Sequence, residues 1–216
     1  MDYIIGIDDA GRGPAIGPMI LAGVLIEKSQ EKDLKEIGAV DSKLLTPKKR
    51  KAIGDELKKK YKYHFEITSP KEIDECENLN TLEAIKAAMI IGKLSEGVNE
   101  KIEAIIDCPS VNTKAWQAEV EKYLSKPEIK IKAEHKADFN YPVVSAASII
   151  AKETREDEVI KITKEIGNIG SGYPADPYTK EFLEKNLDNP KAQQFIRHSW
   201  ATIKNLKKKT DQKKLF

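Results

Sequence analysis

The chain has 216 residues, of which 40% are hydrophobic and 33% are charged, and its formal net charge is +2. This length and hydrophobic content allow one sizeable core with a small appendage. No run approaches the roughly 18 apolar residues of a membrane-spanning helix, and the N-terminus lacks the pattern of a secretion signal. We therefore expect a cytoplasmic protein without a membrane partner.

The first predicted elements are two strands joined by a turn. Residues 3–8 form a short apolar run that ends in acids, which predicts a buried strand. Glycines and prolines between residues 11 and 18 predict a turn, and residues 19–26 predict a second strand. Because this connection is too short for a crossover helix, we expect the two strands to be antiparallel neighbours.

The next elements are a charged helix, a strand and an amphipathic helix. Thr46 and Pro47 predict the start of a helix that extends to about residue 60, and residues 61–68 predict a third strand. Asn80-Thr81 predicts the cap of a further helix. Its expected apolar face consists of Leu82, Ile85, Met89 and Ile90.

In the second half of the chain, strands alternate with helices. Residues 102–107 and 128–133 predict strands, and residues 112–123 lie between them as a predicted helix. A long helical pattern covers residues 143–166, and the chain after residue 179 is helical and increasingly basic. This order predicts an α/β domain with a mixed sheet.

Charge and metal-binding residue types are unevenly distributed. Residues 191–216 carry a net charge of +7 and the preceding 190 residues carry −5. The basic tail suits a polyanionic partner, and a solvated terminal helix explains it equally well. Two cysteines and three histidines lack the spacing of a disulfide framework or a zinc site. A bound metal would therefore be held by carboxylates, which favours Mg²⁺ or Mn²⁺.

Acids follow two of the predicted strands. Asp8 and Asp9 end the first strand and Asp107 ends the fourth, so these carboxylates can converge at one edge of the sheet. Both Asp8 and Asp9 can serve one site only if the chain bends there. Crowded carboxylates repel each other, and a cluster would need a cation. Strand-end aspartates that merely cap loops are an equally good interpretation of the first pair.

A glycine-rich turn follows the first two acids. Gly11-Arg12-Gly13 can bring backbone N–H groups close to a phosphate or a sugar, because glycine has no side chain to block the approach. No Gly-Lys-Ser/Thr follows, so the segment is not a P-loop. An ordinary turn remains the alternative.

Seven blocks of sequence together carry a family resemblance. They are residues 6–18 (GIDDAGRGPAIGP), 41–43 (DSK), 106–109 (IDCP), 135–138 (HKAD), 141–152 (YPVVSAASIIAK), 170–177 (GSGYPADP) and 198–202 (HSWAT). In this order they resemble ribonuclease HII of the archaeal type. The resemblance implies an RNase H-like fold with a central five-stranded mixed sheet flanked by helices. It implies a catalytic domain in residues 1–180 and a basic helical C-terminal extension in residues 181–216.

The resemblance also implies a catalytic site of four acids that bind divalent metal ions, Mg²⁺ or Mn²⁺. Asp8, Asp107 and Asp138 match three family acids. Asp9 stands where the family has glutamate, which is one methylene longer, so its role is the least secure of the four.

Six substrate-binding positions are implied by the resemblance: Gly11, Arg12, Gly13, Ser42, Lys43 and Tyr173. The glycine turn matches the segment that recognises a ribose 2′-hydroxyl through its backbone. Tyr173 matches a tyrosine that packs on the deoxyribose just 3′ of the ribonucleotide, and Ser42 and Lys43 match phosphate contacts. Lys152 and Arg155 follow Asp138 on a helix, where contacts to backbone or acids and a helical salt bridge are equally good interpretations.

The implied activity is that of an endoribonuclease on the RNA strand of RNA–DNA hybrids, acting as a monomer. It would cut 5′ of ribonucleotides, including single ones embedded in duplex DNA, by two-metal-ion catalysis that leaves 5′-phosphate and 3′-hydroxyl ends. Gln212 and Leu215 fit the first half of a sliding-clamp motif, and a frayed basic end is the alternative.

Two rival functions remain. The Asp9 departure supports a non-catalytic nucleic-acid-binding protein of the same fold. The other rival is a DNA-cutting nuclease, against which the glycine turn and Tyr173 argue.

Overall fold

The computed structural model describes residues 2–39 and 45–213. They form two compact units, each made of three segments separated along the chain. Unit 1 comprises Met1–Ala10, Ile20–Glu66 and Asn78–Glu153, and unit 2 comprises Gly11–Met19, Ile67–Glu77 and Thr154–Phe216. The division into a catalytic domain (1–180) and an extension (181–216) concerns function and stays a prediction.

Unit 1 contains a mixed five-stranded sheet in the order β3-β2-β1-β4-β5, which confirms the predicted sheet. The strands are β1 (Tyr3–Ala10), β2 (Met19–Glu27), β3 (Lys62–Thr68), β4 (Ile102–Asp107) and β5 (Lys130–Glu134). The predicted antiparallel pairing of β1 with β2 is confirmed and runs from Tyr3↔Glu27 to Ala10↔Ile20. β1 is parallel to β4, and β4 is parallel to β5, so these three strands have their carboxyl ends at one edge.

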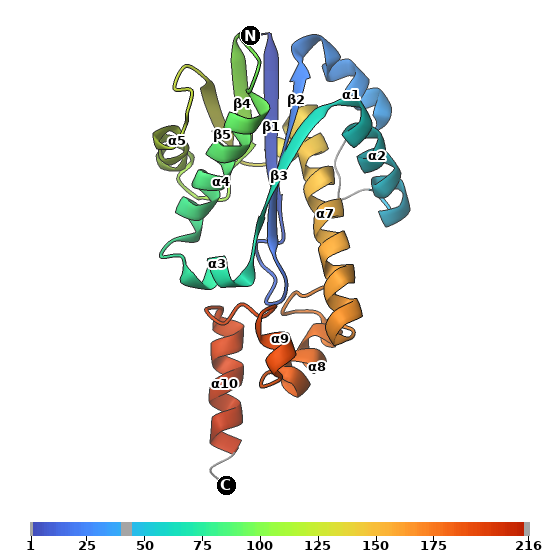
Figure 1. Ribbon diagram of the computed structural model, residues 1–216, viewed down its shortest axis with the longest axis vertical. Helices are drawn as coiled ribbons and strands as arrows, with labels where there is room; N and C mark the ends of the chain where they lie inside the picture. The colour runs from blue at the N-terminus through green and yellow to red at the C-terminus, as the bar shows by residue number, and fades with distance from the viewer. Residues whose placement is uncertain (1, 40–44, 214–216) are drawn as a thin grey trace. The chain divides into compact units, whose positions relative to one another are not determined.

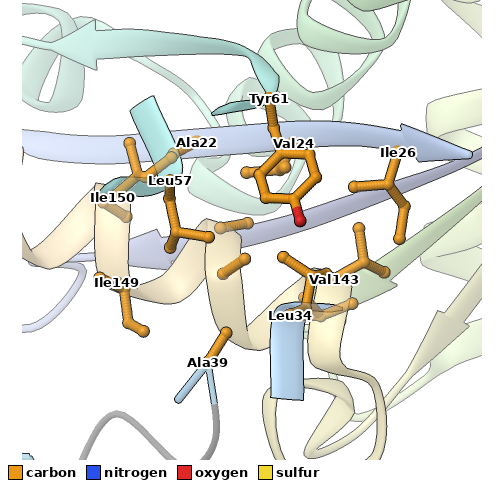
Figure 2. Packing of buried hydrophobic residues seen from close by; sticks show 14 of the residues in the cluster. Ala22, Val24, Ile26, Leu34, Ala39, Leu57, Tyr61, Val143, Ile149 and Ile150 are labelled. Atoms are coloured by element: carbon orange, nitrogen blue, oxygen red, sulfur yellow. The ribbon is translucent and has the colours of Figure 1, made fainter. Parts of the chain in front are cut away.

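Helices cover both faces of the sheet of unit 1 (Figure 1). α1 (Glu31–Ile37), α2 (Pro47–Lys60) and the first half of α7 (Pro142–Ile166) pack on one face, where alternate residues of β2 point. Figure 2 shows this core, with Val24 and Ile26 of β2 facing Leu34, Leu57 and Val143 of the helices. α4 (Leu79–Leu94) lies on the other face and contacts α5 (Thr113–Lys122).

Gly6 of β1 allows α7 to begin directly against the sheet. A Cβ atom at this position would lie 2.4 Å from the backbone carbonyl group of Val143. Real Cβ atoms do not approach backbone so closely, so only glycine fits without displacing the helix. The first turns of α7 therefore lie close to β1, and they include Ser148, a fully buried residue that hydrogen-bonds Asp8.

Of the four residues expected on the apolar face of α4, only Ile90 is fully buried. Met89 is 46% exposed, and Leu82 and Ile85 are only partly buried. The buried residues of the helix are Glu83, Ala84, Ala87, Ala88, Ile90, Ile91 and Leu94. Small alanines and Gly23 of β2 let the helix approach the sheet closely, and this fit depends on tertiary packing rather than on hydrophobic periodicity.

Caps explain where several helices begin. The predicted start of α2 is confirmed, because the Thr46 side chain accepts a hydrogen bond from the backbone N–H of Lys49. α4 begins two residues earlier than predicted, because Asn78 and not Asn80 is the N-cap. α3 (Pro70–Glu75) was not predicted, although Ser69 and Glu72 form a reciprocal capping box at its start.

Unit 2 is mainly helical. It contains α3, the second half of α7, α8 (Pro177–Asn186), α9 (Pro190–Gln193) and α10 (Ala201–Lys213), which confirms the predicted helical C-terminal region. Its core consists of Ala15, Ile16, Ile162, Ile169, Phe182, Leu183, Leu187, Ala192, Ile196 and Ile203. Among the described residues, no helix is both long enough and apolar enough to cross a membrane.

Candidate functional site

The carboxyl ends of β1 and β4 bring three of the predicted acids to one pocket in unit 1. The last paired residues of these strands are Ile7 and Ile106, so Asp8 and Asp107 follow side by side. Asp8, Asp9 and Asp107 all line this pocket. β1 keeps its pairing with β2 through Ala10.

Asp8 is the most confined of these acids, with 6% of its surface exposed. One carboxylate oxygen accepts a 2.7 Å hydrogen bond from the backbone N–H of Asp9. Burial raises the pKa of Asp8 well above its ordinary value, and the neighbouring Asp9 carboxylate raises it further. A hydrogen bond from Ser148 lowers this pKa, and the charge of Asp107 raises it. Burial and the neighbouring carboxylates therefore both disfavour the charged form of Asp8.

Asp107 connects the end of β4 to the segment that carries Asp138. The Asp107 Oδ1 atom accepts a 2.7 Å hydrogen bond from the backbone N–H of Ala137, the first residue of α6 (Ala137–Asn140). Lys136 precedes it with φ 59°, a left-handed conformation that non-glycine residues rarely adopt. Asp138 is 7% exposed and follows Ala137 directly, but it does not line the pocket of the other three acids.

Glu83 of α4 is a fourth acid of this pocket, and the sequence analysis missed it. It is 1% exposed and lines the pocket together with Asp8, Asp9 and Asp107. A charged residue is almost never fully buried without a specific role in the structure. Its position beside Leu82 on a predicted amphipathic helix gave no sign of this burial, because the true buried face was not the expected one.

The acids of the pocket suit a hard divalent cation in their chemistry and charge. All of their donor atoms are carboxylate oxygens, the ligands that Mg²⁺ and Mn²⁺ prefer. Within residues 2–39 and 45–213, no three acidic, histidine or cysteine side chains are grouped closely enough to hold a metal ion together.

In unit 2, the glycine turn and Tyr173 lie next to each other. A Cβ atom on Gly13 would lie 3.5 Å from the Tyr173 ring. Gly11 has φ +85°, and a Cβ atom there would lie 2.4 Å from the Arg155 side chain. Both the backbone conformation and the lack of space therefore favour glycine at this position. Tyr173 is 43% exposed, which leaves part of its ring open to a ligand. The carbonyls of Gly11 and Arg12 accept hydrogen bonds from the Arg197 side chain.

Arg155 supports both of these features. Its Nη2 atom donates a 3.0 Å hydrogen bond to the carbonyl of Ser171, and its guanidinium group lies 5.4 Å from the centre of the Tyr173 ring. Burial lowers the pKa of Arg155, and the nearby Tyr173 and Glu156 raise it. Of the two interpretations left open for Arg155, the structure therefore favours a contact to backbone.

Two predicted substrate-binding residues, Ser42 and Lys43, lie outside the described residues. Lys152 is partly buried on α7, and its neighbour Glu153 pairs with Arg50 of α2 at 2.8 Å.

Comparison with known proteins identifies the family. The family model of ribonuclease HII matches residues 5–203. The chain belongs to the ribonuclease HII family. Ribonuclease HII from Methanococcus maripaludis is 40% identical over 217 residues, which cover 99% of this chain and 90% of that protein.

Two solved structures extend the match to the fold. Ribonuclease H2 from Pyrococcus horikoshii OT3 has a TM-score of 0.85 and 35% identity, and the match covers 97% of this chain and 99% of that one. Ribonuclease HII from Archaeoglobus fulgidus, solved in complex with PCNA, has a TM-score of 0.82 and 34% identity, covering 92% and 95% of the two chains. The RNase H-like fold is thereby confirmed. As a ribonuclease HII the chain is a metal-dependent hydrolase of the ribonuclease H type, which acts on RNA in RNA–DNA hybrids.

Proposed function

We propose that this chain hydrolyses the phosphodiester bond on the 5′ side of a ribonucleotide, both in RNA–DNA hybrids and at single ribonucleotides embedded in duplex DNA. The products would carry 5′-phosphate and 3′-hydroxyl ends. The observation that carries this proposal is the shared pocket of Asp8, Asp9 and Asp107, in which burial and then the charge of Asp9 raise the pKa of Asp8. Such a pocket is suited to bind cations at the point where a phosphodiester is to be cut.

The proposed catalytic and metal-binding residues are Asp8, Asp9, Asp107 and Asp138. When bound, two divalent ions, Mg²⁺ or Mn²⁺, would supply activation of the attacking water and stabilisation of the departing 3′-oxygen. The acids of the chain hold and neutralise these ions. Ser148 restrains the Asp8 carboxylate, and the Ala137 N–H restrains that of Asp107. No side chain has to act as a nucleophile.

Ribose recognition is proposed for Gly11, Arg12, Gly13 and Tyr173 of unit 2. The 2′-hydroxyl is the group that distinguishes RNA from DNA, and it can accept a hydrogen bond from a backbone N–H. Tyr173 is exposed beside Gly13 and contacts the Arg155 guanidinium group, so the open part of its ring can pack on the sugar that follows the ribonucleotide. Ser42 and Lys43 are proposed as phosphate contacts.

The test is cleavage of end-labelled duplex DNA that contains one ribonucleotide, with Mg²⁺ or Mn²⁺ added and with EDTA as the metal-free control. We expect one cut, 5′ of the ribonucleotide, and a product whose 3′ end a polymerase can extend. The matching all-DNA duplex should remain intact. A protein that binds the duplex but leaves it uncut under all conditions would support the rival non-catalytic function, and cleavage of the all-DNA duplex would support the rival DNA nuclease.

A sliding clamp is proposed as a partner of the C-terminal tail. Gln212 and Leu215 match the first half of a clamp-binding motif, and the Archaeoglobus fulgidus relative was solved with PCNA. Titration of a PCNA-type clamp with the full chain and with a variant lacking residues 212–216 tests this contact. Equal affinity of the two would exclude the tail as the binding segment.

A further inference from the structure

Arg197 is fully buried and directs its side chain at the backbone of the glycine turn. Its Nη2 atom donates a 2.6 Å hydrogen bond to the carbonyl of Gly11, and its Nη1 atom donates one of 2.8 Å to the carbonyl of Arg12. The Nε atom donates at 2.9 Å to the carbonyl of Gly17, where the turn ends. One side chain thus binds three carbonyls of the segment between β1 and β2.

Trp200 completes this support. Its indole N–H donates a 3.3 Å hydrogen bond to the carbonyl of Gly13, and its ring lies under the Arg197 guanidinium group at 5.1 Å. Three consecutive carbonyls, at residues 11, 12 and 13, therefore accept hydrogen bonds from the segment 197–200. This segment contains the HSW sequence motif, for which neither the metal site nor the ribose contacts gave a role.

The direction of these carbonyls fixes the direction of the N–H groups that follow them. All described peptide bonds are trans, and in a trans peptide the N–H points opposite to the C=O of the same plane. The Gly11 carbonyl shares its plane with the Arg12 N–H, and the Arg12 carbonyl shares its plane with the Gly13 N–H. Because Arg197 binds both carbonyls, both N–H groups point to the side of the turn away from Arg197.

The backbone around Arg197 is itself held on two sides. Its own N–H donates a 2.9 Å hydrogen bond to the carbonyl of Ala15, beside the bridge between Ile16 and Ile196. The Asp74 carboxylate accepts hydrogen bonds from the backbone N–H groups of His198 at 2.7 Å and Ser199 at 2.8 Å. The backbone that carries the Arg197 side chain is therefore held by hydrogen bonds on both sides. The guanidinium group can then hold the glycine turn in one orientation without a ligand.

From these contacts we propose that Arg197, assisted by Trp200, is a positioning residue for ribose recognition. It orients the peptide planes of the glycine turn so that the Arg12 and Gly13 N–H groups face the 2′-hydroxyl of the ribonucleotide or the phosphate beside it. This inference rests on the proposed function. Arginine suits the role because its planar fork carries five donors, whereas lysine places all three of its donors on one nitrogen and cannot span three carbonyls.

The test measures discrimination between ribose and deoxyribose in binding. Affinity is measured for a duplex with one ribonucleotide and for the all-DNA duplex of the same sequence, in an Asp107→Asn background that keeps the substrate uncut. We expect Arg197→Lys to lose about tenfold in the ratio of the two affinities, the equivalent of one well-placed hydrogen bond. Trp200→Phe, which removes one donor and keeps the ring, should lose less. Affinity for the all-DNA duplex should remain close to that of the background protein.

Ile203→Ala is the matched control. Ile203 is fully buried in the core of unit 2, and its side chain donates nothing to the turn. This variant should have a lower melting temperature and an unchanged ratio of the two affinities. All binding is measured well below the lowest melting temperature of the variants. If Arg197→Lys and Ile203→Ala change the ratio equally, Arg197 only stabilises the fold. If Arg197→Lys does not fold, Trp200→Phe decides, and an unchanged ratio in that variant overturns the inference.

The proposed function and this inference fail in different ways. A chain with native residues that neither cuts nor prefers the ribonucleotide duplex contradicts the proposed function. A chain that cuts and discriminates, and whose Arg197 and Trp200 variants discriminate as well, contradicts the inference alone.

Discussion

The acid pocket of unit 1 and the glycine turn of unit 2 present opposite kinds of chemical group. The pocket presents side-chain carboxylates, and burial, followed by the charge of Asp9, raises the pKa of Asp8. The turn presents backbone, and its carbonyls accept hydrogen bonds from the buried Arg197 side chain and from Trp200. The pocket therefore gains most from a bound cation, whereas the turn is already supported within the protein. Substitutions should therefore show that the acid pocket depends on a bound cation and that the glycine turn does not depend on its ligand.

The largest effect is expected from Asp107→Asn. Asparagine keeps the oxygen that accepts the Ala137 N–H, so the fold should be retained, but it removes a negative charge from the proposed metal ligands. We expect the initial rate of hybrid cleavage to fall by at least about 10³-fold, as for groups that stabilise a transition state. Glu184→Gln removes an exposed acid of α8 and should leave the rate unchanged. Full activity of Asp107→Asn would remove this residue from the metal site.

Tyr173→Ala should have the next largest effect, and it should depend on the substrate. Packing of an aromatic ring on a nucleotide contributes about 1–3 kcal/mol, so we expect a roughly 5- to 150-fold loss of kcat/KM on a duplex with one ribonucleotide. The loss should be smaller on a continuous hybrid, which lacks the deoxyribose after most cut sites. Tyr178→Ala, at a 62% exposed tyrosine on α8, is the control. Equal losses on both substrates would show that the ring only shapes the site.

The pH dependence of stability tests the charge of the pocket directly. The pKa of Asp8 is raised in the folded protein above the ordinary value of 3.8. Its contribution to stability is therefore complete below the unfolded-state pKa and is lost as the pH rises through the folded-state pKa. In EDTA, the native chain should lose more stability than Asp8→Asn between about pH 4 and pH 8, as measured by denaturant unfolding. Parallel curves would mean that the charge on Asp8 is already balanced.

The smallest effect is expected from Asp9→Glu. Glutamate restores the residue of the family pattern and its longer reach, so activity should stay the same or rise a few-fold, on the scale of about 1 kcal/mol in the barrier. Asp9→Asn, which removes the charge, should instead inactivate the enzyme. Steady-state rates with Mg²⁺ and with Mn²⁺ distinguish these outcomes. Inactivation by Asp9→Glu would show that the pocket, including Glu83, has adapted to the shorter acid.

The sequence predicted those helices and strands that are determined by residues within the element itself. Apolar runs predicted β1, β2 and β4, and alternation predicted β3. Thr46 and Asn112 marked two helix starts through their own caps. The face of α4 was missed because alanines and Gly23 set its fit to the sheet, and no periodicity records that fit. The short helix α3 was missed although Ser69 and Glu72 carried its capping signal.

The same distinction applies to the site. Strand-end positions and the family resemblance predicted the convergence of Asp8, Asp9 and Asp107. Glu83 could not be predicted, because its burial depends on which face α4 turns to the sheet. Arg197 escaped notice because its partners lie 180 to 186 residues earlier in the chain.

That long separation has a consequence for the order in which the protein is made. A chain leaves the ribosome N-terminus first, so β1 and its glycine turn emerge long before the donors at residues 197 and 200. By then β4, α6 and the first half of α7 have been synthesised, and with them every acid of the pocket. A nascent chain therefore contains every acid of the pocket before it contains the donors that support the glycine turn.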